Sequence, residues 1–107
     1  MGRQPERSYP VAGASLMKLK WTGKALSDLS RLHEFLAPAN RIAAARTVQS
    51  LAGAPVKLLE NPHLGKRLEE FEPREVRRML VGHYEMRYEI QASTIYVLRL
   101  WHTREDH

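Results

Sequence analysis

The sequence contains no cysteine among its 107 residues. It therefore has no disulfide framework, no thiolate metal ligand and no cysteine nucleophile, which fits a reducing compartment such as the cytoplasm. No apolar run approaches the ~18 residues that a membrane helix needs. A glycine-rich phosphate loop and a serine or threonine nucleophile motif are also missing. Because the five histidines show no short paired spacing, we expect neither a metal nor a cofactor.

What the sequence does have is an excess of bases, with 17 lysines and arginines against 12 acids and a formal net charge of +5. Such a balance favours an acidic partner, either nucleic acid or protein. The charge is not concentrated, because residues 61–78 carry five bases against four acids. Charge alone therefore does not predict binding to nucleic acid.

The chain is long enough for one domain and too short for two. Residues 1–15 contain glycine and proline and few large apolar side chains, which indicates a flexible leader. Residues 16–107 are expected to form the single domain. Met17 is a candidate for the natural start of that domain.

The apolar spacing in the first half of the domain predicts one strand and two helices. Residues 16–21 alternate between apolar and lysine side chains, which is typical of a half-buried strand. Thr22 then suits the N-cap of an amphipathic helix that ends before Pro38. A second helix begins near Asn40, and Pro55 either kinks it or opens a short third helical segment. The expected buried faces are Ala25, Leu29, Leu32 and Leu36, widened by Leu26 and Phe35, in the first helix and Ile42, Ala45, Val48, Leu51 and Ala52 in the second.

The last third of the chain predicts three consecutive strands, at residues 76–80, 84–90 and 94–101, joined by tight turns. The third of these is apolar on both faces, so we expect it to be central and flanked on both edges. Residues 61–75 are expected to be a loop with at most short structure. The fold class is therefore α+β: an N-terminal strand, a two-helix hairpin and a three-stranded antiparallel meander, with the helices packed on one face of a single small sheet.

Several bases and histidines in the second half of the chain are candidate site residues. The arginines inside the expected strands either pair with Glu85 and Glu89 across the sheet or form an open cluster that binds phosphate or acidic side chains. Two bases in the loop are either solvated or at the rim of such a site. Two histidines are candidates for proton transfer. The strand arginines are Arg77, Arg78, Arg87 and Arg99, the loop bases are Lys66 and Arg67, and the histidines are His83 and His102.

The chain carries a series of short motifs between Trp21 and Arg104. They are Trp21-Thr22 with Ala25, Asp28 and Leu29, then Glu60-Asn61-Pro62 with Gly65-Lys66, Arg77-Arg78, Val81-Gly82-His83-Tyr84, Arg87-Tyr88 and Val97 to Arg104. Taken in order, these motifs resemble the RelE/ParE superfamily of toxins from type II toxin–antitoxin systems. The resemblance covers residues 17–106, and its ending is the most specific part. Within the superfamily, the second and third meander strands are most similar to the ParE, or plasmid-stabilisation, branch.

The resemblance implies a toxin that arrests growth by binding DNA gyrase and is neutralised by a cognate antitoxin. The antitoxin is expected to be acidic and DNA-binding, and to wrap the toxin in a hetero-oligomer. The residues implied for antitoxin binding are Leu29, Leu32, Leu36, Tyr84 and Trp101, and those implied for target or phosphate binding are Lys66, Arg67, Arg77, His83, Arg87 and Arg99.

The same resemblance leaves two alternatives. A RelE-like member would cleave messenger RNA on the ribosome, and His102, Arg78 and Arg104 would then be catalytic. The chain departs from that pattern, because Glu85 rather than an arginine follows Tyr84, and no tyrosine follows the last strand. The second alternative is a degenerate toxin fold that only binds its antitoxin.

Overall fold

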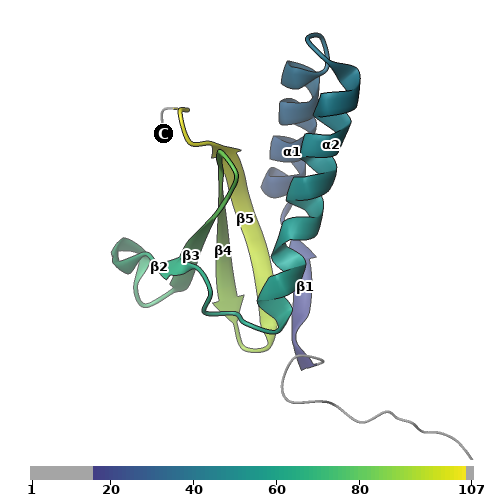
Figure 1. Ribbon diagram of the computed structural model, residues 1–107. Coiled ribbons are helices and arrows are strands. Elements are labelled where there is room, and N and C mark those ends of the chain that lie inside the picture. The colour runs from purple at the N-terminus through teal and green to yellow at the C-terminus, as the bar shows by residue number, and fades with distance from the viewer. Residues whose placement is uncertain (1–15, 106–107) are drawn as a thin grey trace, which may run out of the picture.

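The computed structural model describes residues 16–105; the expected leader, residues 1–15, lies outside the described residues. Five strands form one sheet in the order β1-β5-β4-β3-β2, with a helical hairpin beside it (Figure 1). The strands are β1 (Lys18–Trp21), β2 (Lys66–Arg67), β3 (Glu75–Val81), β4 (Tyr84–Gln91) and β5 (Thr94–His102), the helices α1 (Gly23–Leu36) and α2 (Arg41–Gly53), and the short 3₁₀ helices η3 (Ala54–Leu59) and η4 (Glu69–Phe71).

The three-stranded meander is confirmed, since β3, β4 and β5 pair antiparallel in sequence order. β5 is flanked on both edges, as predicted, because β4 pairs with one edge and β1 pairs with the other in parallel. Gly82 adopts a φ of +59° in the turn between β3 and β4, a conformation that glycine adopts readily. The loop at residues 61–75 contains the two-residue strand β2, which pairs with Arg77 and Arg78 of β3.

Both helices begin at the predicted caps. The Thr22 side chain accepts a hydrogen bond from the Ala25 N–H at 3.1 Å, and the Asn40 side chain accepts one from the Ala43 N–H at 2.9 Å. These caps satisfy backbone donors that have no partner within the helix. Pro55 stands near the start of η3, so the chain opens a third helical segment there.

The predicted buried face of α2 is partly wrong. Leu51 and Ala44 are buried, but Ile42 is 68% exposed, and Ala45 and Ala52 are exposed as well. The tip of the helical hairpin projects past the end of the sheet (Figure 1). Residues near the tip therefore have only the neighbouring helix to pack against. On α1, the expected stripe is buried at Ala25 and Leu32, while Leu26 and Phe35 are exposed, by 51% and 77%.

The core lies between the helices and one face of the sheet. Met86, Tyr88, Ile95, Val97 and Leu100 of the sheet are fully buried there. They pack against side chains of both helices and η3, which places the helices on one face, as predicted. The helical side chains of this core are Ala25, Leu32, Leu51 and Leu58.

Candidate functional site

Beyond the end of β1, the first half of α1 and its N-cap residue lie along the edge of β5 and bond to its backbone. The Thr22 N–H donates to the Val97 carbonyl at 3.1 Å, and the Thr22 hydroxyl donates to the Leu98 carbonyl at 3.0 Å. One turn further along α1, the Asp28 carboxylate accepts the backbone N–H of Leu100 at 3.0 Å. The helix thus satisfies backbone groups on the outer edge of β5, and its second half lies beside the end of that strand.

Asp28 is 4% exposed and holds Arg99 in a two-point ion pair. The Arg99 Nε and a terminal nitrogen donate to its two oxygens at 2.8 and 3.2 Å. Burial by itself would raise the pKa of Asp28, but the bonds from Arg99 and Leu100 and the charges of Arg99 and Arg31 outweigh it and lower the pKa. Arg99, a predicted target-binding residue, is therefore engaged within the fold.

A groove of about 610 Å³ separates the second half of α1 from the ends of β4 and β5. We call it the helix groove. It brings together Leu32, Leu36 and Tyr84, which the resemblance assigned to antitoxin binding, with His102 and Arg104, which it assigned to catalysis. The residues lining the groove are Arg31, Leu32, Phe35, Leu36, Tyr84, His102, Arg104 and Glu105.

Local contacts fix His102 at the end of this groove. Its Nδ1 accepts the Arg104 backbone N–H at 3.1 Å, so the proton of a neutral ring is on Nε2. The ring contacts the edge of Tyr84, with ring centroids 5.2 Å apart. The ring of His83 stacks on it, with centroids 6.0 Å apart. Histidine chemistry in the groove would therefore have to use Nε2.

The turn after β5 contacts helix α1 and the β3–β4 turn. Arg31 of α1 pairs with Glu105 at 3.3 Å, and the Thr103 N–H donates to the His83 carbonyl at 2.8 Å. Arg31 and Phe35 were not among the predicted site residues. The signal for Phe35 was its place in the apolar stripe of α1, which predicted burial instead.

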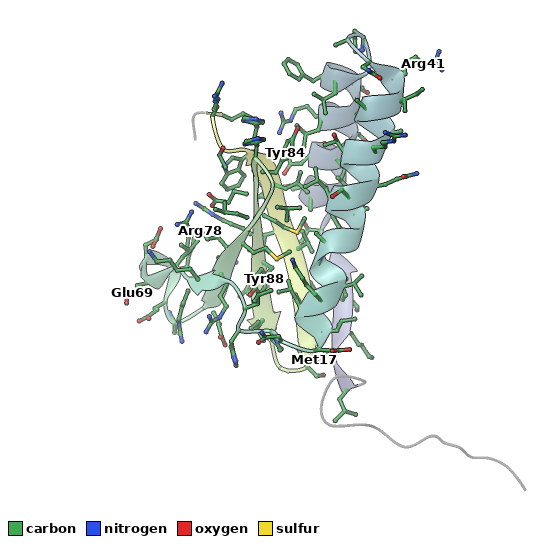
Figure 2. All side chains as sticks on the ribbon, in the orientation of Figure 1. Met17, Arg41, Glu69, Arg78, Tyr84 and Tyr88 are labelled. Carbon is green, nitrogen blue, oxygen red and sulfur yellow. The ribbon has the colours of Figure 1, made fainter. Side chains whose placement is uncertain are left out.

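Arg78 does not join His102 and Arg104. Strand register places Arg78 opposite Arg87, and Tyr84 opposite His102. Since neighbouring side chains on a strand alternate between faces, Arg78 and Arg87 lie on the face away from the helices, which we call the open face. Tyr84 and His102 lie on the helix face. Figure 2 shows Tyr84 near α1 and Arg78 on the side away from the helices. The candidate catalytic set is thus divided between two faces.

Arg78 and Arg87 on the open face line a hollow of about 550 Å³ with Lys66 and Arg67 of β2. Glu85 accepts from Arg78 at 3.5 Å and from Arg87 at 3.4 Å. The predicted cross-strand pairing thus occurs for Arg78 of β3, whereas Arg87 pairs with Glu85 along its own strand, β4. Glu89, its other expected partner, pairs with Arg74.

The remaining candidates divide between structural contacts and the surface. Arg77 donates to Glu75 at 3.0 Å and to the Gly65 carbonyl at 2.7 Å, which anchors the loop before β2. Trp101 lies on the open face, where Arg87 stacks on its ring at 4.8 Å. Leu29 is half-buried against the core. Two of the five residues assigned to antitoxin binding therefore lie outside the helix groove.

Over residues 16–105, the structure offers no group of three acidic or histidine side chains placed to hold a metal ion. None of the described helices is long and apolar enough to cross a membrane.

Comparison with known proteins agrees with this architecture. A chromosomal ParDE toxin–antitoxin system from P. aeruginosa contains a chain with a TM-score of 0.68 and 22% identity, covering 81% of this chain and 96% of that one. The archaeal RelE–RelB complex from Pyrococcus horikoshii OT3 gives a TM-score of 0.60 at 15% identity, covering 85% of this chain and 99% of that one. At these identities the likeness shows a shared fold.

Among curated protein sequences, none matches this chain significantly. The sequence model of the ParE toxin of type II parDE toxin–antitoxin systems, however, matches residues 19–107. That match begins within β1 and runs to the end of the chain, so it takes in both helices and nearly the whole sheet. The chain therefore belongs to the ParE toxin family of type II toxin–antitoxin systems.

Proposed function

We propose that this toxin arrests growth by binding DNA gyrase, without covalent chemistry of its own, and that a cognate antitoxin neutralises it. The observation that supports binding over chemistry is the placement of Arg78 and His102 on opposite faces of the sheet. A nuclease needs its proton-transfer group and its phosphate-stabilising charge around one reacting phosphate. That requirement is difficult to meet when the sheet separates the two side chains.

The helix groove supports the antitoxin part of the proposal. Its walls carry Leu32, Leu36 and the 77% exposed ring of Phe35. Exposed apolar side chains of this size, rimmed by charge, mark protein interaction sites. Arg31 and Arg104 lie on the same groove, so an acidic, DNA-binding antitoxin with a partly apolar tail would complement it. Toxin and antitoxin would then form a hetero-oligomer in the cytoplasm, where gyrase is found.

The test is pulse-labelling of DNA and protein synthesis after induction of the chain in cells that lack the antitoxin. We expect DNA synthesis to fall first, with translation initially intact. An earlier fall in protein synthesis would contradict gyrase binding and favour the ribosome-dependent nuclease. Unchanged growth at high expression would instead favour a degenerate toxin fold that only binds its antitoxin.

A further inference from the structure

A second hollow, of about 530 Å³, lies on the open face between the first turn of α1 and the segment around η4. All four charged residues that line it are bases: Lys24, Arg74, Arg87 and Arg99. We call it the basic hollow. It shares Arg87 with the neighbouring hollow beside β2, but Lys24 and Arg74 were not among the residues predicted as a site. They come from segments about 50 residues apart in the sequence, so only the fold brings them together.

Carboxylates and aromatic rings of the fold hold the guanidinium groups of the basic hollow in place. Arg74 makes two bonds to Glu89, at 2.8 and 3.1 Å, and Arg99 makes two to Asp28. Arg87 contacts the rings of Phe71 and Trp101, with its central carbon 5.4 and 4.8 Å from their centroids. Since a guanidinium has five N–H donors, these contacts leave donors for a ligand. Side chains that are already ordered lose little entropy when a ligand binds.

The balance of charge and apolar surface distinguishes between ligand classes. Three of the four bases already pair with a carboxylate: Arg74 with Glu89, Arg87 with Glu85, and Arg99 with Asp28. Among the described residues that line the hollow, Lys24 is then the one base outside these pairs, which is little free charge for a site built to follow a chain of phosphates. Apolar residues, including Phe71 and Leu98, line the same hollow. One carboxylate next to an apolar side chain matches this surface better than a polyanion does.

The position of α1 adds to the attraction for a single negative charge. The helix begins at Gly23, which lines the hollow, and its first turn contains no acidic residue. The start of a helix carries partial positive charge. This contribution acts over short range and so favours an anion seated near Lys24.

We propose that the basic hollow binds a short acidic peptide segment of a partner protein. One carboxylate of the segment contacts Lys24 and the arginine guanidinium groups, and a neighbouring apolar side chain packs on Phe71 and Leu98. The site is separate from the helix groove. It rests on the proposed function only in that the antitoxin would supply the segment.

The test uses the full chain, labelled with ¹⁵N by cell-free synthesis, and a blocked hexapeptide of alternating leucine and glutamate. NMR follows the backbone amides and the arginine Nε–H groups during titration. We expect saturable shifts at Gly23, Lys24, Arg87 and Arg99. The variant Lys24→Glu should bind the peptide about tenfold more weakly, the equivalent of one charge-assisted contact. The control Lys57→Glu makes the same charge change at an exposed residue of η3 and should bind within about twofold of the unaltered chain.

Three outcomes would overturn the proposal. One is the absence of saturable shifts at these residues. Another is an equal response to a peptide in which glutamine replaces glutamate, because the site would then not recognise charge. The third is tighter binding of a thymidine hexanucleotide at the same residues, which would make the hollow a nucleic-acid site. None of these measurements uses toxicity. A chain that arrests growth but does not bind the peptide contradicts this proposal alone, and the converse contradicts only the proposed function.

Discussion

At the scale of single residues, Asp28 links helix α1 to strand β5 and orients Arg99. It is a carboxylate within the apolar stripe of α1, yet it is buried because it accepts from Arg99 and from the backbone of Leu100. Removal of this charge would leave Arg99 without its counter-ion, and breaking a buried ion pair in this way destabilises the fold. Asp28 therefore fixes both where α1 lies and how Arg99 faces the basic hollow.

We expect Asp28→Asn to lower the free energy of unfolding by about 2 kcal/mol and to make stability less dependent on pH in acid. The folded-state pKa of Asp28 is lowered. Its contribution is therefore present above the unfolded pKa, about 4, and is lost as pH falls through the folded value. Urea unfolding between pH 7 and pH 3 measures both effects. Glu60→Gln, at an exposed carboxylate, is the control. An unchanged acid dependence in Asp28→Asn would contradict this account.

Tyr88 performs a comparable role for the loop before β2. Its buried hydroxyl accepts the Gly65 N–H at 2.8 Å and donates to the Pro62 carbonyl at 2.7 Å. Gly65 itself is required there, because a Cβ would lie 2.5 Å from the Arg78 carbonyl. Burial raises the pKa of Tyr88, so the hydroxyl stays protonated and able to donate at neutral pH.

We expect Tyr88→Phe to cost about 1–2 kcal/mol of stability, since it leaves a buried N–H without an acceptor. Trypsin should then cleave faster after Lys66 and Arg67, because the loop that leads into β2 is less firmly held. Thermal unfolding and limited proteolysis measure the two effects. Tyr96→Phe, at a half-buried tyrosine of β5, should leave both nearly unchanged. Equal effects in the two variants would show that the loop does not depend on this hydroxyl.

At the scale of elements, the helical hairpin exposes more apolar surface than its sequence pattern predicts. Phe35 of α1 is 77% exposed on the helix groove, and Ile42 of α2 is 68% exposed near the hairpin tip. Both side chains contribute little to folding, because neither is buried on the described chain. Phe35 lies on the proposed docking surface, whereas Ile42 is exposed outside the helix groove.

We expect Phe35→Ala to weaken binding of the cognate antitoxin at least tenfold, because aromatic side chains in a groove contribute most to such interfaces. The unfolding free energy should change by less than about 0.5 kcal/mol. Ile42→Ala removes a similarly exposed apolar side chain and should have little effect on binding. Titration calorimetry with the antitoxin, combined with urea unfolding, measures both quantities. Equal loss of affinity in the two variants would place the antitoxin elsewhere on the hairpin.

At the scale of the whole molecule, the sheet separates two surfaces of different chemistry. The helix face ends in a groove with His102 and Arg104, and the open face carries Arg78, Arg87 and their acidic partners. The strand register sets His102 and Arg78 on opposite sides of the sheet. The two surfaces can therefore bind two different segments, of one partner or of two.

From this separation we expect His102→Ala and Arg78→Ala to retain growth arrest, each within about threefold of the parent in colony-forming units after induction. Loss of an essential proton-transfer group would instead lower activity by a factor of about 10² or more. As a control for protein level, each variant is co-expressed with the antitoxin, so that the cells keep growing, and is quantified by immunoblotting. Loss of arrest in both variants, with the protein present, would reverse the conclusion in favour of the nuclease.

The local sequence by itself determined the main elements of this protein, but not β2 and η4, which lie in a segment expected to be a loop. Alternation at residues 84–90 and the tight turns on either side specified the meander, and Thr22 and Asn40 specified the helix starts, because side-chain period, turns and caps act over a few residues. The two apolar faces of β5 also predicted its central place in the sheet. Short motifs in the right order identified the superfamily, which the family match over residues 19–107 then bore out.

Only the tertiary structure decided which residues meet. The strand register set Arg78 and His102 on opposite faces, and a one-residue change in register would reverse such an assignment. The sequence could not show that α1 runs past the end of the sheet, which exposes Phe35 and Ile42. Nor could it bring Lys24 and Arg74 to one hollow. These outcomes depend on packing between segments far apart in the chain, and no local pattern encodes that packing.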